Sequence, residues 1–142
     1  MKSIEVVAAI IKKENKIFIT RREGGDFHYM WEFPGGKIEA SETREEALIR
    51  EIKEELELDI KVKEFLTTID YDYSNFHLIM HCFICEVIGG ELNLNVHNSA
   101  KWISLEEVDK EVWVPADLLV VEELRKKFQK KEDWFHLINY YK

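Results

Sequence analysis

The chain has 142 residues, of which 46% are apolar and 34% are charged, which is typical of one globular domain with a real core and excludes a disordered chain. Its formal net charge of −8 excludes non-specific binding to long nucleic acids, which relies on Lys and Arg neutralising phosphates. A small phosphate compound can still bind through bridging divalent cations. The first long apolar run, Val6 to Ile11, is too short for a signal peptide or a membrane span, so we expect a cytoplasmic protein that does not bind membranes.

Two β-like runs, residues 4–13 and 16–22, open the chain, and the polar turn between them predicts a hairpin. The next segment, residues 22–36, holds four of the six glycines and is predicted to be an irregular loop. Residues 43–57 are predicted to be helical, because apolar residues recur every three or four positions and Ser41 or Thr43 can cap the start.

Residues 60–73 and 77–90 form a second predicted strand pair, joined near Ser74 and Asn75. A loop with short strand pieces follows in residues 89–105, and residues 105–110 are expected to form one helical turn. Residues 116–131, after Pro115, are predicted to form a second amphipathic helix, and an aromatic tail ends the chain. The pattern indicates a mixed sheet with two main helices, an α/β protein.

Cys82 and Cys85 form a CxxC pair, a spacing found in redox and zinc sites. Their surroundings are predicted to be a strand, in which positions three apart point to opposite faces. We therefore interpret both cysteines as small buried hydrophobic residues.

Carboxylates gather on the first predicted helix, where Glu51, Glu54 and Glu55 stand at i, i+3 and i+4 and share one face. Glu42 lies just before the helix, at the same end. Like charges so placed repel one another unless a cation lies among them, and oxygen-rich clusters suit Mg²⁺ or Mn²⁺. The preceding pair Gly35 and Gly36 favours a metal site, because glycine lets a backbone carbonyl approach a cation closely.

An ordinary exposed helix is the alternative for the same segment. Opposite charges stand four residues apart in the pairs Glu46–Arg50, Arg50–Glu54 and Lys53–Glu57. Such pairs stabilise a solvated helix by a few tenths of a kcal/mol each.

The spacing of this segment resembles the box of the Nudix hydrolases, and in particular their MutT-type branch of oxidised-dGTP and CTP pyrophosphohydrolases. The matching residues are Gly36, Glu42, Arg50, Glu51, Ile52, Glu54, Glu55 and Leu58. Glu57 stands where the family usually has a helix-ending Gly, so we expect the helix to run slightly longer. The resemblance covers about residues 3–128 and not the tail from Gln129. It implies the Nudix fold, a mixed β-sheet sandwiched between helices (α/β/α), and we expect residues 1–142 to form a single domain.

The resemblance implies a set of metal ligands, the carbonyl of Gly35 and the carboxylates of Glu51, Glu54 and Glu55. Arg50, expected with Glu51 and Glu54 to be catalytic, would hold the carboxylates in place together with Glu42. In the family, bound Mg²⁺ or Mn²⁺ neutralises a triphosphate and polarises a water that attacks phosphorus. In MutT-type members this gives a nucleoside monophosphate and pyrophosphate.

The general base is less clear from the resemblance. Many relatives carry a further Glu six residues before a Trp, and here Val96 takes that place before Trp102, followed by His97. Either Glu51 or Glu54 then serves as the base, or His97 assists, and the alternative for His97 is a simple loop residue.

Five residues are candidates for substrate binding. Arg22 and Lys37 are candidate phosphate contacts, and the alternative for Arg22 is a solvated charge at a strand end. Phe33 and Tyr73 are candidate walls for a nucleobase, and the alternative for each is core packing. Asp117 corresponds to a position that contacts the base edge in MutT-type relatives. An ionised Asp117 can only accept hydrogen bonds. It would therefore favour a base that presents an exocyclic amine, as cytosine and oxidised guanine do. Its alternative is a helix-start residue that complements the helix dipole.

The expected function is metal-dependent hydrolysis of nucleoside or deoxynucleoside triphosphates, for sanitation of the nucleotide pool and hence DNA repair, by a monomer or homodimer. One alternative is a Nudix hydrolase of another nucleoside diphosphate derivative, such as a nucleotide sugar or ADP-ribose. A second is a non-catalytic nucleotide-binding module on the same fold.

Overall fold

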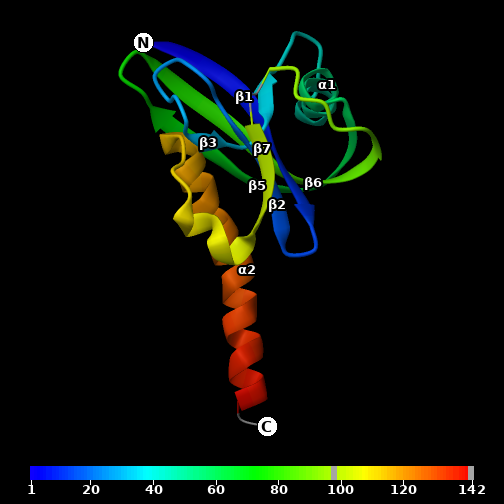
Figure 1. Ribbon diagram of the computed structural model, residues 1–142. Coiled ribbons are helices and arrows are strands. Elements are labelled where there is room, and N and C mark those ends of the chain that lie inside the picture. The colour runs from blue at the N-terminus through cyan, green and yellow to red at the C-terminus, as the bar shows by residue number, and fades with distance from the viewer. Residues whose placement is uncertain (97–98, 141–142) are drawn as a thin grey trace.

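A mixed seven-stranded sheet forms the centre of the computed structural model, which describes residues 1–96 and 99–140, with side chains described up to Phe128 (Figure 1). The strands are β1 (Lys2–Lys13), β2 (Lys16–Arg21), β3 (Trp31–Glu32), β4 (Gly35–Lys37), β5 (Leu58–Asp72), β6 (Phe76–Gly90) and β7 (Ser99–Ser104). The helices are α1 (Arg44–Leu56), the 3-10 helix η1 (Leu105–Lys110) and α2 (Pro115–Tyr140). The strand order is β3-β2-β1-β6-β5, with β4 paired to β1 and β7 paired to β2. Both predicted strand pairs and both main helices are thereby confirmed.

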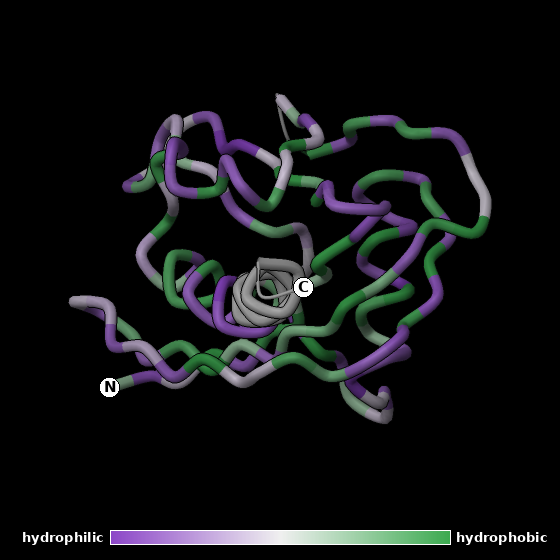
Figure 2. Tube along the Cα trace, turned by 90° about the horizontal axis from the view of Figure 1, so that it is seen from below, coloured by the Kyte–Doolittle hydropathy of each residue, from purple (hydrophilic) through white to green (hydrophobic). Residues whose placement is uncertain are grey.

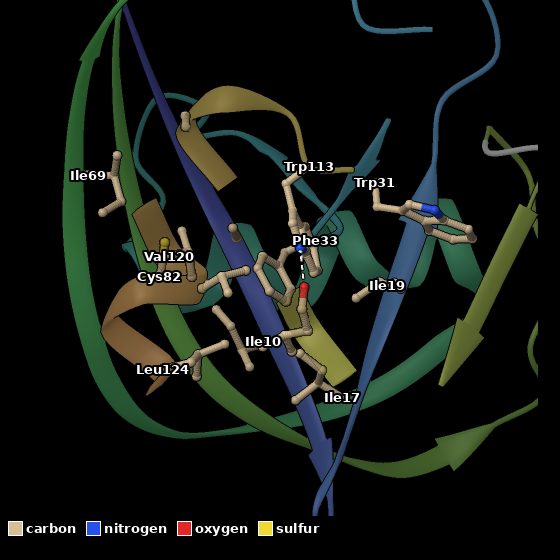
Figure 3. Packing of buried hydrophobic residues seen from close by; sticks show 14 of the residues in the cluster. Ile10, Ile17, Ile19, Trp31, Phe33, Ile69, Cys82, Trp113, Val120 and Leu124 are labelled. Atoms are coloured by element: carbon tan, nitrogen blue, oxygen red, sulfur yellow. Dashed lines mark hydrogen bonds between the residues drawn. The ribbon is translucent and has the colours of Figure 1, made fainter. Parts of the chain in front are cut away.

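Two apolar clusters lie on opposite faces of the sheet, because successive side chains of a strand point to opposite sides. Ala8 and Ile10 of β1 belong to the cluster that includes Val120 and Leu124 of α2 (Figure 3). The neighbouring β1 residues Val7, Ala9 and Ile11 belong to the cluster under α1. The α/β/α arrangement expected from the sequence is confirmed.

The two cysteines illustrate the same alternation. Cys82 belongs to the cluster on the α2 side and Cys85 to the cluster on the α1 side, and both thiols are free and buried. Burial raises the pKa of Cys82 and raises that of Cys85 to about 12. The interpretation as buried hydrophobic residues is confirmed.

The pairing between β1 and β6 is parallel and runs from Lys2 opposite Phe76 to Ile11 opposite Cys85. It places β1 in the middle of the sheet, where it can also pair with β2 and β4. The sequence pattern gave no sign of this long-range register.

Residues 22–36 were expected to be one irregular loop, and this is wrong for their second half. Trp31–Glu32 pairs with β2, and Gly35–Lys37 pairs with β1. A Cβ on Gly35 would lie 1.9 Å from the carbonyl oxygen of Val7, so the close approach of β4 to β1 requires glycine there. Residues 22–30, and Phe33 and Pro34 between the two strands, remain without strand structure.

Helix α1 begins with a capping box, in which the Thr43 side chain accepts from the Glu46 backbone and the Glu46 side chain accepts from the Thr43 backbone. It ends at Leu56, so the expectation that the helix runs past the family's glycine position is wrong. Glu57 itself adopts the left-handed conformation (φ 58°, ψ 27°), and its N–H donates to the carbonyl of Lys53 at 3.0 Å. The chain must turn there because the next residue already pairs in β5. Figure 2 shows apolar and polar residues alternating along this helix, as one buried face requires.

Helix α2 is longer than the sequence pattern indicated, because it continues to Tyr140 through most of the segment expected to be an aromatic tail. Its first half packs on the sheet, and its second half projects away from the body of the molecule (Figure 1). Among the described residues, no helix combines the length and the apolar character needed to cross a membrane.

Candidate active site

Arg50 is the centre of a hydrogen-bond network at the face of α1 that was predicted to bind metal. Its guanidinium donates two bonds to the carboxylate of Glu42, at 2.6 and 2.9 Å, and one to the carbonyl of Lys37 at 3.0 Å. It also donates to Glu51 at 3.0 Å and to Glu54 at 3.2 Å. Its hydrogen bond lowers the pKa of Glu42, and the same bond raises the pKa of Arg50. Arg50 therefore neutralises part of the repulsion among these carboxylates and fixes where they lie.

A glycine on β4 makes room for the most buried of these carboxylates. A Cβ on Gly36 would lie 2.3 Å from the carboxylate carbon of Glu51, so that carboxylate would have to move aside. The Glu51 side chain, 15% exposed, therefore lies directly over the backbone of the glycine pair. Glycine at position 36 thus leaves the Glu51 carboxylate room to lie where it does.

These residues fit a hard divalent cation by their chemistry, since carboxylate and carbonyl oxygens are what Mg²⁺ and Mn²⁺ prefer. In the described part of the chain, no three His, Cys, Asp or Glu side chains lie close enough together to ligate one cation. Arg50 instead bonds one oxygen of Glu51 and one oxygen of Glu54. The second oxygen of each carboxylate is the one that a cation would take.

A cavity of about 530 Å³ opens beside this end of α1. Six residues predicted for the site line it, from the glycine loop, the acidic helix, the strands and the start of α2: Arg22, Phe33, Gly35, Glu55, Tyr73 and Asp117. Five others do not: Glu51, which lies behind Gly36; Glu54, whose side chain is 59% exposed; Lys37, which is exposed and whose described bond is that of its carbonyl; and Glu42 and Arg50, which bond to each other. The cavity thus joins Glu55 and the glycine pair to the predicted base-binding residues.

Asp117 lies in the deep part of this cavity, 5% exposed. Its carboxylate accepts a hydrogen bond from the backbone N–H of Phe33 at 3.1 Å. This bond joins the start of α2 to the short connection between β3 and β4. Burial, together with the nearby charge of Glu32, raises the pKa of Asp117 well above its ordinary value. The sequence interpretation considered an ionised Asp117 that only accepts, whereas the raised pKa favours the acid form, which can also donate.

The two aromatic candidates have both a packing and a cavity role. Phe33 stacks on Trp113 at 5.0 Å between ring centroids, in the core cluster shown in Figure 3. Tyr73 accepts a hydrogen bond on its hydroxyl from the Ala116 N–H at 3.0 Å, which satisfies a free donor at the start of α2. Burial raises the pKa of Tyr73 to about 12. Both rings therefore pack in or against the core cluster, and both also line the cavity.

Glu32 is a cavity residue that the sequence analysis missed. Its carboxylate accepts from Nε of Arg22 at 2.8 and 2.9 Å, so the predicted phosphate contact is engaged by a carboxylate at the cavity wall. Phe27, whose ring lies 5.1 Å from that of Tyr73, was missed as well. No signal in the sequence marked Glu32, because its burial and its bonds with Arg22 appear only in the structure.

Val96, which occupies the place of the family's additional Glu, is 66% exposed and lines the cavity. The position is therefore next to the site, and it carries no carboxylate in this chain. His97, the other candidate there, lies outside the described residues.

The fold and the cavity define an α/β protein with a cavity between an acidic helix and a buried, partly aromatic pocket. The chain matches the NUDIX domain over residues 1–133 and therefore belongs to the Nudix family. It is 36% identical over 123 residues to the CTP pyrophosphohydrolase of Escherichia coli, covering 86% of this chain and 91% of that protein. It is 33% identical over 129 residues to the 8-oxo-dGTP diphosphatase of the same bacterium, covering 89% and 99%.

Two further similarities bear on the fold and the substrate. The solution structure of the E. coli ORF135 protein superposes with a TM-score of 0.77 at 35% identity, covering 89% of this chain and 91% of that one. An ADP-ribose pyrophosphatase of Methanocaldococcus jannaschii is 46% identical, but over only 89 residues, which are 61% of this chain and 52% of that protein.

Proposed function

We propose that this protein hydrolyses nucleoside triphosphates to the monophosphate and pyrophosphate with the help of Mg²⁺ or Mn²⁺, and that it thereby removes oxidised or otherwise unwanted nucleotides from the precursor pool. It is a hydrolase acting on acid anhydrides, as its family and its similarity to pyrophosphohydrolases and diphosphatases indicate. The preferred substrates in the proposal are CTP or a modified dCTP, and 8-oxo-dGTP.

One observation carries the proposal. A single cavity reaches from Glu55 on the acidic helix and Gly36 on β4 to a buried pocket lined by the aromatic Phe33 and the acidic Asp117. A nucleoside triphosphate has the same two parts, a charged chain and a flat base with donors and acceptors. The relatives that this chain matches over most of their length are named for such substrates.

The proposed ligands of the cation are Glu51, Glu54, Glu55 and the carbonyl of Gly35. A divalent cation bound there would neutralise phosphate charge and lower the pKa of a bound water. Arg50 and Glu42 hold the helix carboxylates in place: Arg50 bonds one oxygen of Glu51 and one oxygen of Glu54, and a cation would take the other oxygen of each.

The chain's own residues supply the rest of the proposed site. Phe33 offers a ring to one face of the base, and Asp117 offers its carboxyl group to the base edge. Arg22, which Glu32 orients, and Lys37, which is exposed near the glycine pair, are the proposed phosphate contacts.

The proposed base is Glu51 or Glu54 rather than His97, because the position of the additional loop carboxylate is occupied by Val96. The remaining parts of the proposal are a single domain over residues 1–142, a cytoplasmic location, and a monomeric or homodimeric state with no nucleic acid polymer as partner.

The test is a screen of CTP, 8-oxo-dGTP, dGTP, ADP-ribose and a nucleotide sugar with Mg²⁺, in which pyrophosphate and nucleoside monophosphate are both measured. Pyrophosphate release from a triphosphate supports the proposal. Monophosphate formation from ADP-ribose or the sugar alone, with no pyrophosphate from any triphosphate, would favour the alternative Nudix activity. Binding of nucleotides without any hydrolysis would favour the binding module.

The variant Glu54→Gln tests the metal assignment, and Glu45→Gln is its control. Glu54→Gln keeps the size of the side chain but removes a carboxylate, and should lower turnover by about a hundredfold or more while the fold survives. Glu45→Gln, which changes an exposed carboxylate in the first turn of the same helix, should have little effect. Parent-like turnover by Glu54→Gln would make the metal assignment wrong.

A further inference from the structure

The end of α1 that carries Glu54 and Glu55 is fastened by a segment far away in the sequence. The last carbonyls of a helix have no partner within it and must find others. The carbonyl of Glu54 accepts from the side-chain amide of Asn95 at 2.8 Å, and the carbonyl of Glu55 accepts from the Asn95 backbone N–H at 3.0 Å. The carbonyl of Leu56 accepts from the backbone N–H of Asn93 at 2.9 Å. Segment 93–95 therefore satisfies three successive carbonyls of the last turn.

A glycine at the end of β6 brings the chain into this position. A Cβ on Gly90 would lie 2.4 Å from the carbonyl oxygen of Glu57, and Gly90 has φ +84°, so only glycine lets the chain pass the end of α1 so closely. The segment that follows is thereby held along the last turn of the helix.

The same segment leads directly to the cavity. Val96, the next residue after Asn95, lines the cavity together with Glu55 and Gly36. Asn95 therefore lies between the cavity wall and the backbone of two proposed metal ligands, and it is joined to both of those ligands by hydrogen bonds. A shift of this segment would move the last turn of α1 and the cavity rim together.

We infer that Asn95 is a positioning residue of the reaction: through its two hydrogen bonds it fixes the last turn of α1, and so the carboxylates of Glu54 and Glu55, relative to the cavity. The inference rests on the proposed function, because it takes those carboxylates as ligands of a divalent cation. Asn95 itself touches neither cation nor substrate in this role.

Asparagine is suited to this place because its side-chain amide donates to the carbonyl of Glu54, in addition to the backbone N–H that any residue but proline would offer to Glu55. An Asp has the same shape, but its carboxylate would face the carbonyl of Glu54 at the negative end of the helix dipole. An Ala would keep the backbone bond to Glu55 and lose the side-chain bond to Glu54. The two substitutions therefore form a graded series, with Asp the more disruptive.

The experiment compares Asn95→Asp and Asn95→Ala with Asn93→Ala, a matched control in which the exposed side chain is removed and the backbone bond to Leu56 is kept. Three quantities are measured on each full-length protein: Mn²⁺ affinity by calorimetry without nucleotide, the Mg²⁺ concentration for half-maximal pyrophosphate release, and the melting temperature. We expect Asn95→Asp to weaken Mn²⁺ binding and raise the Mg²⁺ requirement by about tenfold, and Asn95→Ala by less. The KM for nucleotide at saturating Mg²⁺ should stay within about twofold, and Asn93→Ala should behave like the parent.

A merely structural role would lower the melting temperature of the Asn95 variants and leave both metal measurements at the parent values, and that result would overturn the inference. If Asn95→Asp does not fold, Asn95→Ala decides by the same comparison. A parent that binds Mn²⁺ but releases no pyrophosphate would refute the proposed function alone, because calorimetry would still report on Asn95. A parent that binds no Mn²⁺ would refute both.

Discussion

Arg50 holds Glu42 through two parallel hydrogen bonds, Nε to one carboxylate oxygen at 2.6 Å and Nη2 to the other at 2.9 Å. Such a paired contact fixes the plane of the guanidinium as well as its position. The remaining nitrogen, Nη1, is thereby directed to Glu51 and Glu54. Glu42, which lies before the helix, thus sets the positions of Glu51 and Glu54 on the helix through Arg50.

Glu42→Gln should therefore impair metal use although Glu42 is no proposed ligand. The amide presents only one acceptor oxygen to Arg50, so the guanidinium can turn. The carboxylates of Glu51 and Glu54 are then no longer held in fixed positions by the same Arg50 nitrogen. We expect turnover at limiting Mg²⁺ to fall by about tenfold to a hundredfold. Steady-state kinetics over a Mg²⁺ series measures this. Unchanged kinetics would mean that the bonds from Arg50 to Glu42 are not needed for the site.

The identity of the general base is tested by Glu51→Gln and His97→Ala. Because no carboxylate occupies position 96, we expect Glu51→Gln to be far more damaging than His97→Ala, which should have a small effect. The pH profile of kcat should keep its shape in His97→Ala. The reverse pattern, with a steep loss in His97→Ala and the disappearance of an ionisation near a pKa of about 6.5, would assign the role to His97.

Asp117 is expected to select the base. Asp117→Asn keeps the volume and keeps an oxygen that can accept from the Phe33 N–H, but it presents an amide to the cavity in place of the carboxyl group. The ratio of kcat/KM between CTP and 8-oxo-dGTP should change by about tenfold or more, which corresponds to about 1.4 kcal/mol. The Mg²⁺ requirement should not change. An unchanged ratio with altered stability only would mean that Asp117 serves α2 and that the base is read elsewhere.

The stability of the protein should also depend on pH through Asp117. Burial raises the pKa of Asp117, so the folded chain holds this proton more tightly than the unfolded chain, in which the pKa of Asp is about 3.9. The stability gained from this proton is complete below the unfolded pKa and is lost as pH rises through the folded pKa. Asp117→Asn has no proton to lose, so its stability relative to the parent should rise from pH 4 to pH 8. Urea unfolding at both values measures this, and the opposite trend would show an ionised Asp117 in the folded state.

The left-handed residue at the end of α1 gives a prediction of stability alone. Glu57 has φ 58°, a conformation that costs a residue with a Cβ about 1 kcal/mol and costs glycine almost nothing. Glu57→Gly should therefore raise the melting temperature by about 2–4 °C. Glu45→Gly, inside the same helix, should lower it, because glycine is a poor helix former there. A lower melting temperature for Glu57→Gly would mean that the Glu57 side chain stabilises the turn more than its backbone strain costs.

Local features of the fold were predictable because their signals lie within a few residues of one another. The capping box of α1, its buried face and the hairpin between β1 and β2 all follow from short-range patterns. The acidic face was also visible, since Glu51 and Glu54 are three residues apart on one helix.

Long-range relationships were not predictable from the single sequence. The bond from Phe33 to Asp117 joins residues 84 positions apart, and the contact between Asn95 and Glu54 joins residues 41 positions apart. No periodicity encodes such pairs, because they arise only when strands adopt their register in the sheet. For the same reason Glu32, an ordinary residue in the sequence, was recognised as a cavity residue only in the structure.

The parallel register of β1 with β6 sets an order of events during protein synthesis. β1 leaves the ribosome before β6, so every residue of its parallel pairing must wait for a partner about seventy positions later. At synthesis rates of roughly 5–20 residues per second, this delay is on the order of several seconds. During that time the apolar run Val6–Ile11 can pair only with β4, which lies opposite Val6, Val7 and Ala8, and its edge toward β6 is open. The strand at the centre of the finished sheet is thus a segment of the nascent chain that needs protection from aggregation.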